Sequence, residues 1–180
     1  NATIVNDVNG GRCIETRTGN IDLTLNNVNL TATQTGSQPF TVGGTGIDVT
    51  VNINNSTINA GKGYGITTFN PTALTINNST VTGYAALNIK AASGSEGSAG
   101  SVINVTGSTL AGVNNWPGES NAYSTIMLED SNVKINVDST STVKAIATSN
   151  QQSVLCFGNE TVESIVSGCD ITIAGNIVIE

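Results

Sequence analysis

One short segment gathers most of the side chains that could recognise a ligand. Residues 111–122 contain Trp116, the only tryptophan of the chain. An indole ring stacks on the apolar face of a sugar, while neighbouring amides and carboxylates bind its hydroxyl groups. We therefore expect a ligand site formed by Asn114, Asn115, Trp116, Glu119, Asn121 and Tyr123. The alternative is that Trp116 folds back and anchors its own loop.

The residues that catalysis would require are sparse. The chain has no histidine, no Asp-Asp pair and no Asp-rich calcium loop, and its only adjacent acids are Glu129 and Asp130. Polysaccharide hydrolases on solenoid folds need paired carboxylates, and lyases need a base and commonly calcium. We assign no catalytic residue, no metal and no cofactor. A polysaccharide lyase or glycoside hydrolase is kept as the alternative to a non-catalytic protein.

Three cysteines, an odd number, suggest one disulfide and one free thiol. Cys156 and Cys169 are separated by twelve residues within one predicted turn. A disulfide between them would contribute about 3 kcal/mol and would indicate an oxidising, extracellular compartment. Cys13 is left over, either buried as a small apolar side chain or paired with sequence outside this chain.

The composition excludes two kinds of partner. Charged residues make up 11% of the chain, against about 25% in a typical soluble domain, and the net charge is −7. The six Lys and Arg residues are scattered along the sequence. Nucleic acids and anionic membrane surfaces both require concentrated positive charge, so we expect neither partner. No apolar run is long enough to insert in a bilayer.

An internal repeat decides which elements must position these residues. Residues 23–30, 51–58 and 74–81 share one pattern, in which two alternating apolar positions precede a polar pair and a second short apolar strand. Later copies begin at Ile103, Ile135 and Ile171. Alternation with period two indicates strands, and the pairs Asn-Asn, Thr-Gly, Asp-Ser and Ala-Gly are typical of turns that tolerate left-handed backbone.

Three apolar columns follow from this alignment. The first contains Leu23, Val51, Leu74, Ile103, Ile135 and Ile171. The second contains Leu25, Ile53, Ile76, Val105, Val137 and Ile173. The third contains Leu30, Ile58, Val81, Leu110, Val143 and Val178. A further strand is expected upstream of each first column, around Ile14, Val42, Ile66, residues 87–89, residues 126–128 and residues 154–155.

The fold class that fits this pattern is an all-β parallel β-helix, a three-sheet solenoid of about six coils spanning residues 1–180 as one domain. First-column spacings of 28, 23, 29, 32 and 36 residues suit strands in register joined by turns of variable length. A β-sandwich is the alternative. Repetition of Asn-Asn-Ser-Thr at residues 54–57 and 77–80 argues against it, because only stacked parallel coils can join such side chains into ladders.

Stacking of coils also brings polar and aromatic residues together on the outer face. Aligning Ile14, Ile66, Ile89 and Leu128 places Glu15, Thr67, Lys90 and Glu129 in one outward column. Lys90 and Glu129 then form an ion pair between adjacent coils, worth at most about 1 kcal/mol; the alternative is a catalytic acid and base. We expect the three tyrosines, Tyr64, Tyr84 and Tyr123, to form a stacked column.

The segments LTINNSTVTG, INVTGSTLAG and VTVNINNSTINAG resemble the pectate-lyase-like β-helix superfamily. More narrowly, they resemble the non-catalytic adhesive β-helix domains of bacterial surface proteins, over about residues 12–179. The resemblance implies a right-handed helix of three parallel sheets and attachment to a cell surface.

We therefore expect a secreted or cell-surface bacterial adhesin or binding module, cut from a longer protein. Its partner would be a host or microbial glycan or a surface protein. Two further hypotheses are a structural stalk and an ice-binding face, the second resting on Thr24 and Thr75 in a column that asparagines interrupt.

Overall fold

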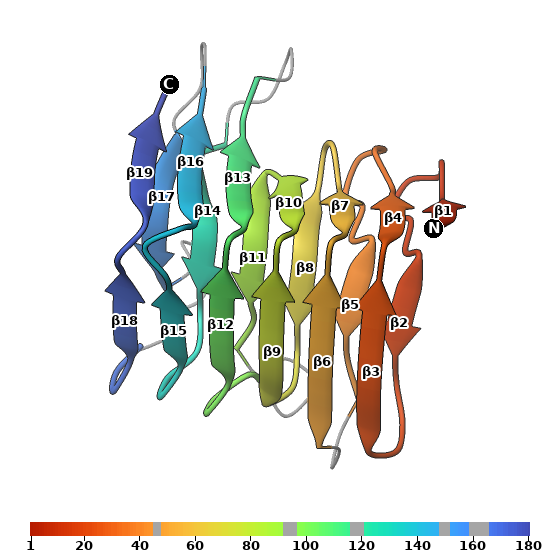
Figure 1. The fold of residues 1–180 in the computed structure, drawn as a ribbon, viewed down its shortest axis with the longest axis horizontal. Coiled ribbons are helices and arrows are strands. Elements are labelled where there is room, and N and C mark those ends of the chain that lie inside the picture. Colours follow the sequence, from red (N-terminus) through yellow and green to blue (C-terminus); the bar gives the residue numbers. More distant parts are fainter. Residues whose placement is uncertain (45–47, 92–96, 116–120, 148–151, 159–165) are drawn as a thin grey trace.

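The computed structural model describes residues 1–44, 48–91, 97–115, 121–147, 152–158 and 166–180. Every regular element in these ranges is a β-strand, and neighbouring strands pair in parallel. Connections between parallel strands of one sheet are right-handed. The chain is therefore a right-handed parallel β-helix, in which successive coils stack along the long axis of the molecule (Figure 1).

Three sheets, here named A, B and C, run along the stack. Sheet A contains β1 (Ala2–Val5), β4 (Val28–Thr31), β7 (Thr57–Asn59), β10 (Thr80–Gly83), β13 (Thr109–Val113), β16 (Thr142–Ile146) and β19 (Asn176–Ile179). Sheet B contains β2 (Ile14–Thr16), β5 (Phe40–Val42), β8 (Tyr64–Thr68), β11 (Ala85–Ile89), β14 (Tyr123–Leu128) and β17 (Gln152–Phe157). Sheet C contains β3 (Ile21–Asn26), β6 (Val49–Asn54), β9 (Thr72–Asn77), β12 (Val102–Thr106), β15 (Lys134–Val137) and β18 (Asp170–Ile173).

The chain passes through the sheets in the order B, C, A six times, from β2 to β19. Six complete coils were expected from the repeat, and this expectation is confirmed. Strand β1 is an additional strand of sheet A that pairs with β4 before the first complete coil. Its side chains are exposed, which explains why the repeat pattern did not reveal it.

The first and second apolar columns have the predicted register in all six coils. The third column is correct in five coils and wrong in the last, where Val143 pairs with Ile177 and not with Val178. The last turn is one residue shorter than those of the first four coils and two residues shorter than that of the fifth. Gly175 makes this possible, because a Cβ there would lie 2.7 Å from the Asp138 carbonyl oxygen.

The core lies between the three sheets and is closed in the middle coils. The largest fully buried side chains include Phe40, Ile53, Ile76, Ile103 and Ile126. At the ends the same columns open to solvent: Ile4 is 38% exposed and Ile177 is 54% exposed. The middle coils therefore carry most of the hydrophobic stabilisation, because burial of apolar area supplies it.

The turns between sheets C and A use the predicted chemistry. Asn27, Asn55 and Asn78 have φ of 54°, 50° and 46°, the left-handed region that asparagine tolerates. The Asn54 amide donates to the Asn26 amide oxygen at 2.9 Å, and the Asn77 amide donates to that of Asn54 at 2.9 Å. The ladder expected from the repeated Asn-Asn pairs is therefore present.

Serines in the turns of the later coils form a second ladder. The backbone N–H groups of Ser56, Ser79 and Ser108 each donate to the hydroxyl of the serine in the next coil, at 3.0 to 3.1 Å. These serines are buried, so the hydroxyls satisfy backbone groups that would otherwise lack a partner.

Candidate functional site

Three of the residues predicted to bind a ligand, Asn114, Asn121 and Tyr123, are joined by hydrogen bonds. Asn114 is fully buried, and its side-chain amide donates to the Asn121 carbonyl oxygen at 3.0 Å. Asn114 is therefore held within the chain, and a role for it in ligand binding stays a prediction. Asn115 and Asn121 are exposed. Trp116 and Glu119 lie outside the described residues.

Asn121 and Tyr123 instead belong to a groove on the outer face of sheet B. The groove has a volume of about 390 Å³ and extends over strands β8, β11, β14 and β17. Its described lining consists of Tyr64, Lys90, Asn121, Ala122, Tyr123, Ser124, Met127, Glu129, Ser153, Cys156 and Gly158. A concave surface with a few polar groups among apolar ones is the usual form of a small-molecule site.

Three tyrosine rings contact one another beside the groove. The rings of Tyr84 and Tyr123 stack with centroids 4.3 Å apart and planes 3° apart. Tyr64 meets Tyr123 edge to face at 6.3 Å. The predicted stacked column is confirmed for Tyr84 and Tyr123 alone, because Tyr64 is the register partner of Ala85. Tyr84 is buried, and Tyr64 and Tyr123 line the groove.

Local backbone geometry explains why the tyrosines meet. Leu87 pairs with Ile126, so Tyr84 and Tyr123 occupy equivalent positions three residues earlier. Gly83, just before Tyr84, allows the coils to approach closely, because a Cβ there would lie 2.6 Å from the Gly63 carbonyl oxygen. The rings are therefore fixed by the stacking of coils and need no rearrangement to present an aromatic surface.

Met127 and Cys156 line the middle of the groove. They are register partners on β14 and β17, and their strand neighbours Ile126 and Leu155 belong to the core or pack against it. Side chains alternate between the two faces of a strand, so Met127 and Cys156 point outward. Thioether and thiol sulfurs are polarizable and weakly polar, which gives the groove an adaptable apolar surface.

An ion pair also lines the groove. The Lys90 ammonium lies 2.7 Å from both oxygens of the Glu129 carboxylate. The Glu129 side chain is 4% exposed and that of Lys90 is 25% exposed. The predicted pairing of Lys90 with Glu129 is confirmed, but the column used to predict it is wrong. Ile66 pairs with Leu87 and not with Ile89, so Glu15 and Thr67 align with Asn88 and Met127.

The predicted disulfide is not formed, because Cys13, Cys156 and Cys169 are all free thiols. Cys156 faces the groove, whereas Cys169 packs against the core and its thiol lies 3.6 Å from the Asp130 carbonyl oxygen. The two thiols thus have different surroundings, which explains why the predicted disulfide between them is absent. Burial raises the pKa of the Cys13 thiol, opposed by hydrogen bonding to the Thr31 backbone, so this side chain behaves as a weakly reactive apolar group.

Two further properties concern the described part of the chain alone. It contains no group of three or more His, Cys, Asp or Glu side chains arranged to hold a metal ion. It also contains no helix with the length and apolar character needed to cross a membrane.

The groove as a unit was missed by sequence reasoning, which placed the site on the Trp116 loop. Tyr64, Lys90, Met127 and Cys156 were not assigned to a ligand site, although the strands that carry them were recognised. The outward positions of sheet B held the necessary signal. They combine sulfur, aromatic and charged side chains, whereas the outward positions of β6, β9 and β12 in sheet C are mostly Thr and Asn.

No known protein family matches the chain, and no curated protein or solved structure matches it either. The fold and the groove therefore define its class: a parallel β-helix with a small amphipathic groove on one outer sheet.

Proposed function

We propose that this chain is a non-catalytic binding module of a secreted or cell-surface bacterial protein, and that it binds a glycan in the groove of sheet B. The observation that carries the proposal is the composition of the groove. Tyr64 and Tyr123 supply aromatic surface, Met127 supplies an apolar contact, and the Lys90–Glu129 pair supplies a donor and an acceptor. A sugar ring has one apolar face and a rim of hydroxyl groups, and it needs both kinds of contact.

The rigidity of the groove supports binding in a preformed site. The Tyr84–Tyr123 stack and the ion pair each join neighbouring coils, so the side chains lose little further freedom when a ligand binds. A preformed site lowers the entropic cost of association. The secreted or surface location and the adhesive role are extended to this chain from its resemblance to bacterial adhesive β-helix domains.

A glycan array with the intact chain, followed by titration calorimetry with the best saccharide, tests the proposal. Tyr64→Ala should weaken binding by about 1–3 kcal/mol, as loss of an aromatic anchor commonly does. Thr24→Ala, on the exposed face of sheet C, is the matched control and should bind like the wild type. Trp116→Ala distinguishes the groove from the loop: a loss confined to that variant would move the site away from the groove.

The alternative is an enzyme that cleaves polysaccharides, and the observation in its favour is the Lys90–Glu129 pair in the groove. A lysine can act as a base and a carboxyl group as an acid when their protonation is suitable. Incubation with acidic polysaccharides, with and without calcium, decides between the two functions. New unsaturated or reducing ends that disappear in Glu129→Gln would establish the enzyme and reject the non-catalytic proposal.

A further inference from the structure

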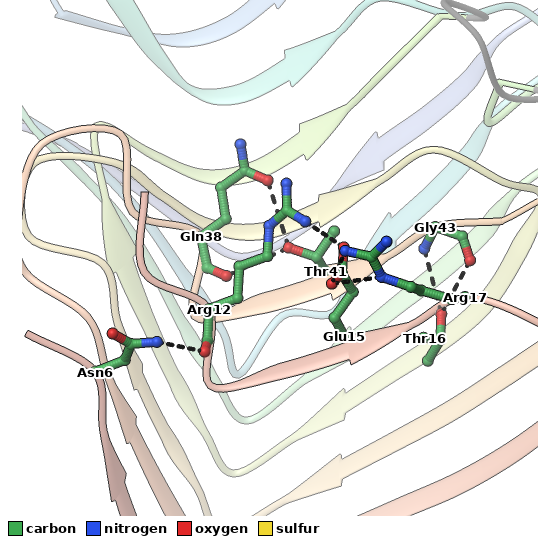
Figure 2. A network of polar contacts seen from close by, with 8 residues as sticks. All are labelled: Asn6, Arg12, Glu15, Thr16, Arg17, Gln38, Thr41 and Gly43. Atoms are coloured by element: carbon green, nitrogen blue, oxygen red, sulfur yellow. Dashed lines mark hydrogen bonds and ion pairs between the residues drawn. The ribbon is translucent and has the colours of Figure 1, made fainter. Parts of the chain in front are cut away.

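A second cluster of charged side chains lies at the other end of sheet B. Glu15 is on β2, and Arg12 and Arg17 flank it in sequence (Figure 2). Glu15 pairs in register with Thr41, Thr41 with Thr67, and Thr67 with Asn88, which lies two residues from Lys90. The groove begins at Tyr64 on β8, so two strand spacings, about 10 Å, separate the strand of this cluster from the nearest strand of the groove.

Both arginines bind the same carboxylate. Arg12 Nη1 contacts Glu15 Oε1, and Arg17 approaches Glu15 Oε2 with Nε at 2.9 Å and Nη2 at 2.8 Å. The cluster thus carries two positive charges and one negative charge, in a chain whose net charge is −7. A local excess of positive charge on a negative protein attracts an anion specifically to that point.

The arginines remain able to bind a second anion. A guanidinium has five N–H donors arranged in a planar fork, and Glu15 occupies only part of each fork. The Arg12 side chain is 38% exposed and that of Arg17 is 73% exposed, so a ligand can reach both. The remaining N–H groups match the paired oxygens of a carboxylate or sulfate.

The surrounding contacts hold the cluster in place. The Asn6 side-chain amide donates to the Arg12 carbonyl oxygen at 2.8 Å, which fixes the chain where Arg12 begins (Figure 2). At the last residue of β2, just before Arg17, the Thr16 hydroxyl accepts from the Gly43 N–H at 3.2 Å. Glu15 itself keeps two like-charged guanidinium groups close together in the absence of a ligand, because opposite charge offsets their repulsion.

We infer that Arg12 and Arg17 form a binding site for a single anionic group, the carboxylate or sulfate of a sparsely charged acidic saccharide. A polyanion such as a nucleic acid fits poorly, since it needs many cations in a row and this cluster offers two. Glu15 acts as a positioning residue that holds both forks and also competes with the ligand for them. The site does not depend on ligand binding in the groove.

Nuclear magnetic resonance titration of the intact, isotope-labelled chain tests the inference, with the arginine Nε–H signals as the readout. The probes are galacturonic acid, sodium sulfate and, as the neutral control, galactose. The two anions should shift the Arg12 and Arg17 signals and galactose should not. Comparing galacturonate with sulfate shows which anionic group binds more tightly.

Three variants separate this role from a structural one. Arg17→Gln removes the more exposed guanidinium group and should lower the apparent affinity for the anion at least fivefold. Lys134→Gln removes one positive charge and one exposed ion pair on sheet C, and it should change the affinity less than twofold. Glu15→Gln removes the internal competitor and should raise the affinity severalfold, an effect that a purely structural carboxylate would not produce.

Equal affinity in the wild type and Arg17→Gln would overturn the inference, and so would equal losses in Arg17→Gln and Lys134→Gln. If circular dichroism shows that Glu15→Gln does not fold, the comparison of Arg17→Gln with Lys134→Gln still tests whether the anion binds at the arginines. Tyr64→Ala should bind the anion normally, so failure of the groove proposal and failure of this inference give different results.

Discussion

The Lys90 ammonium is 2.7 Å from each oxygen of the Glu129 carboxylate, although the two residues are 39 positions apart in sequence. They meet because Ile89 and Leu128, the preceding residues, are register partners on adjacent strands. The ion pair therefore joins two adjacent coils as well as lining the groove.

Lys90→Met should destabilise the chain by about 2–4 kcal/mol, because Glu129 is 4% exposed and would lose its ammonium partner. The double variant Lys90→Met with Glu129→Gln should recover much of this loss, since no charge then remains without its counterion. Urea unfolding of the two single variants and the double variant measures the coupling. Wild-type stability in Lys90→Met would show that the pair is no more than a solvated surface contact.

Val105→Asp should prevent folding. Val105 is 1% exposed in the second apolar column, and a buried carboxylate costs several kcal/mol against a total stability of about 5–15 kcal/mol. Asn104→Asp is the control, because Asn104 lies on the outer face and its side-chain oxygen only accepts from Asn136 at 3.0 Å. Circular dichroism should show strand structure in the control alone; a folded Val105→Asp would refute the register.

Gly63→Ala should destabilise the chain by about 1–3 kcal/mol, the usual cost of forcing extra atoms into a packed site. A Cβ at Gly63 would collide with the Ser37 backbone, lying 2.6 Å from its nitrogen. Gly43→Ala is the matched control, because its Cβ would meet only the Thr16 carbonyl oxygen, at 3.5 Å. The difference between the two melting temperatures is the measurement, and equal values would contradict the close approach of these coils.

Asp138 should make stability depend on pH in the acid range. Hydrogen bonds from Ser141 and Thr140, and then from the Gly107 N–H, hold the pKa of this carboxyl below its ordinary value. Its contribution to stability is therefore present above the unfolded pKa and is lost as pH falls through the lowered folded pKa. The melting temperature of Asp138→Asn should fall less than that of the wild type over this range; parallel curves would exclude the effect.

The three thiols should differ in reactivity and none should be linked. Mass spectrometry of an unreduced digest should find Cys156 and Cys169 in separate peptides. Cys13 should react with iodoacetamide more slowly than an unfolded thiol, because burial raises its pKa and reduces the thiolate present at neutral pH. A Cys156–Cys169 linkage would contradict the free thiols of the structure and would indicate an oxidising compartment.

The alignment of strands could be predicted from the sequence where two sheets are joined by a short turn of similar sequence in most coils, and it was less accurate elsewhere. Between sheets C and A the turn is Asn-Asn-Ser-Thr in two coils and begins with another pair typical of turns in most others, so two columns and the amide ladder could be placed residue by residue. The one error, Val178 for Ile177, arose because both residues are apolar and the last turn is shorter. Periodicity cannot distinguish two adjacent apolar residues when the turn length changes.

Sheet B was harder to align, because segments of variable length precede and follow its strands. The strands themselves were identified, but Ile66 was matched with Ile89 when its partner is Leu87. Ile89 was matched correctly with Leu128, so Lys90 was still placed opposite Glu129. The groove could not be found in this way, since it depends on which outward side chains remain uncovered, and that is a property of the packed molecule.

The three sheets do not begin at the same level of the stack. In the part of the chain that the structure describes, sheet A has seven strands and sheets B and C have six each, because β1 lies one level beyond β2 and β3 (Figure 1). Among the described residues, β1 pairs with β4 in sheet A, and neither of the other two sheets has a strand at its level. The apolar side chains of β1 therefore lack the other two walls of the core, so Ile4 is 38% exposed although its register partner Leu30 is fully buried.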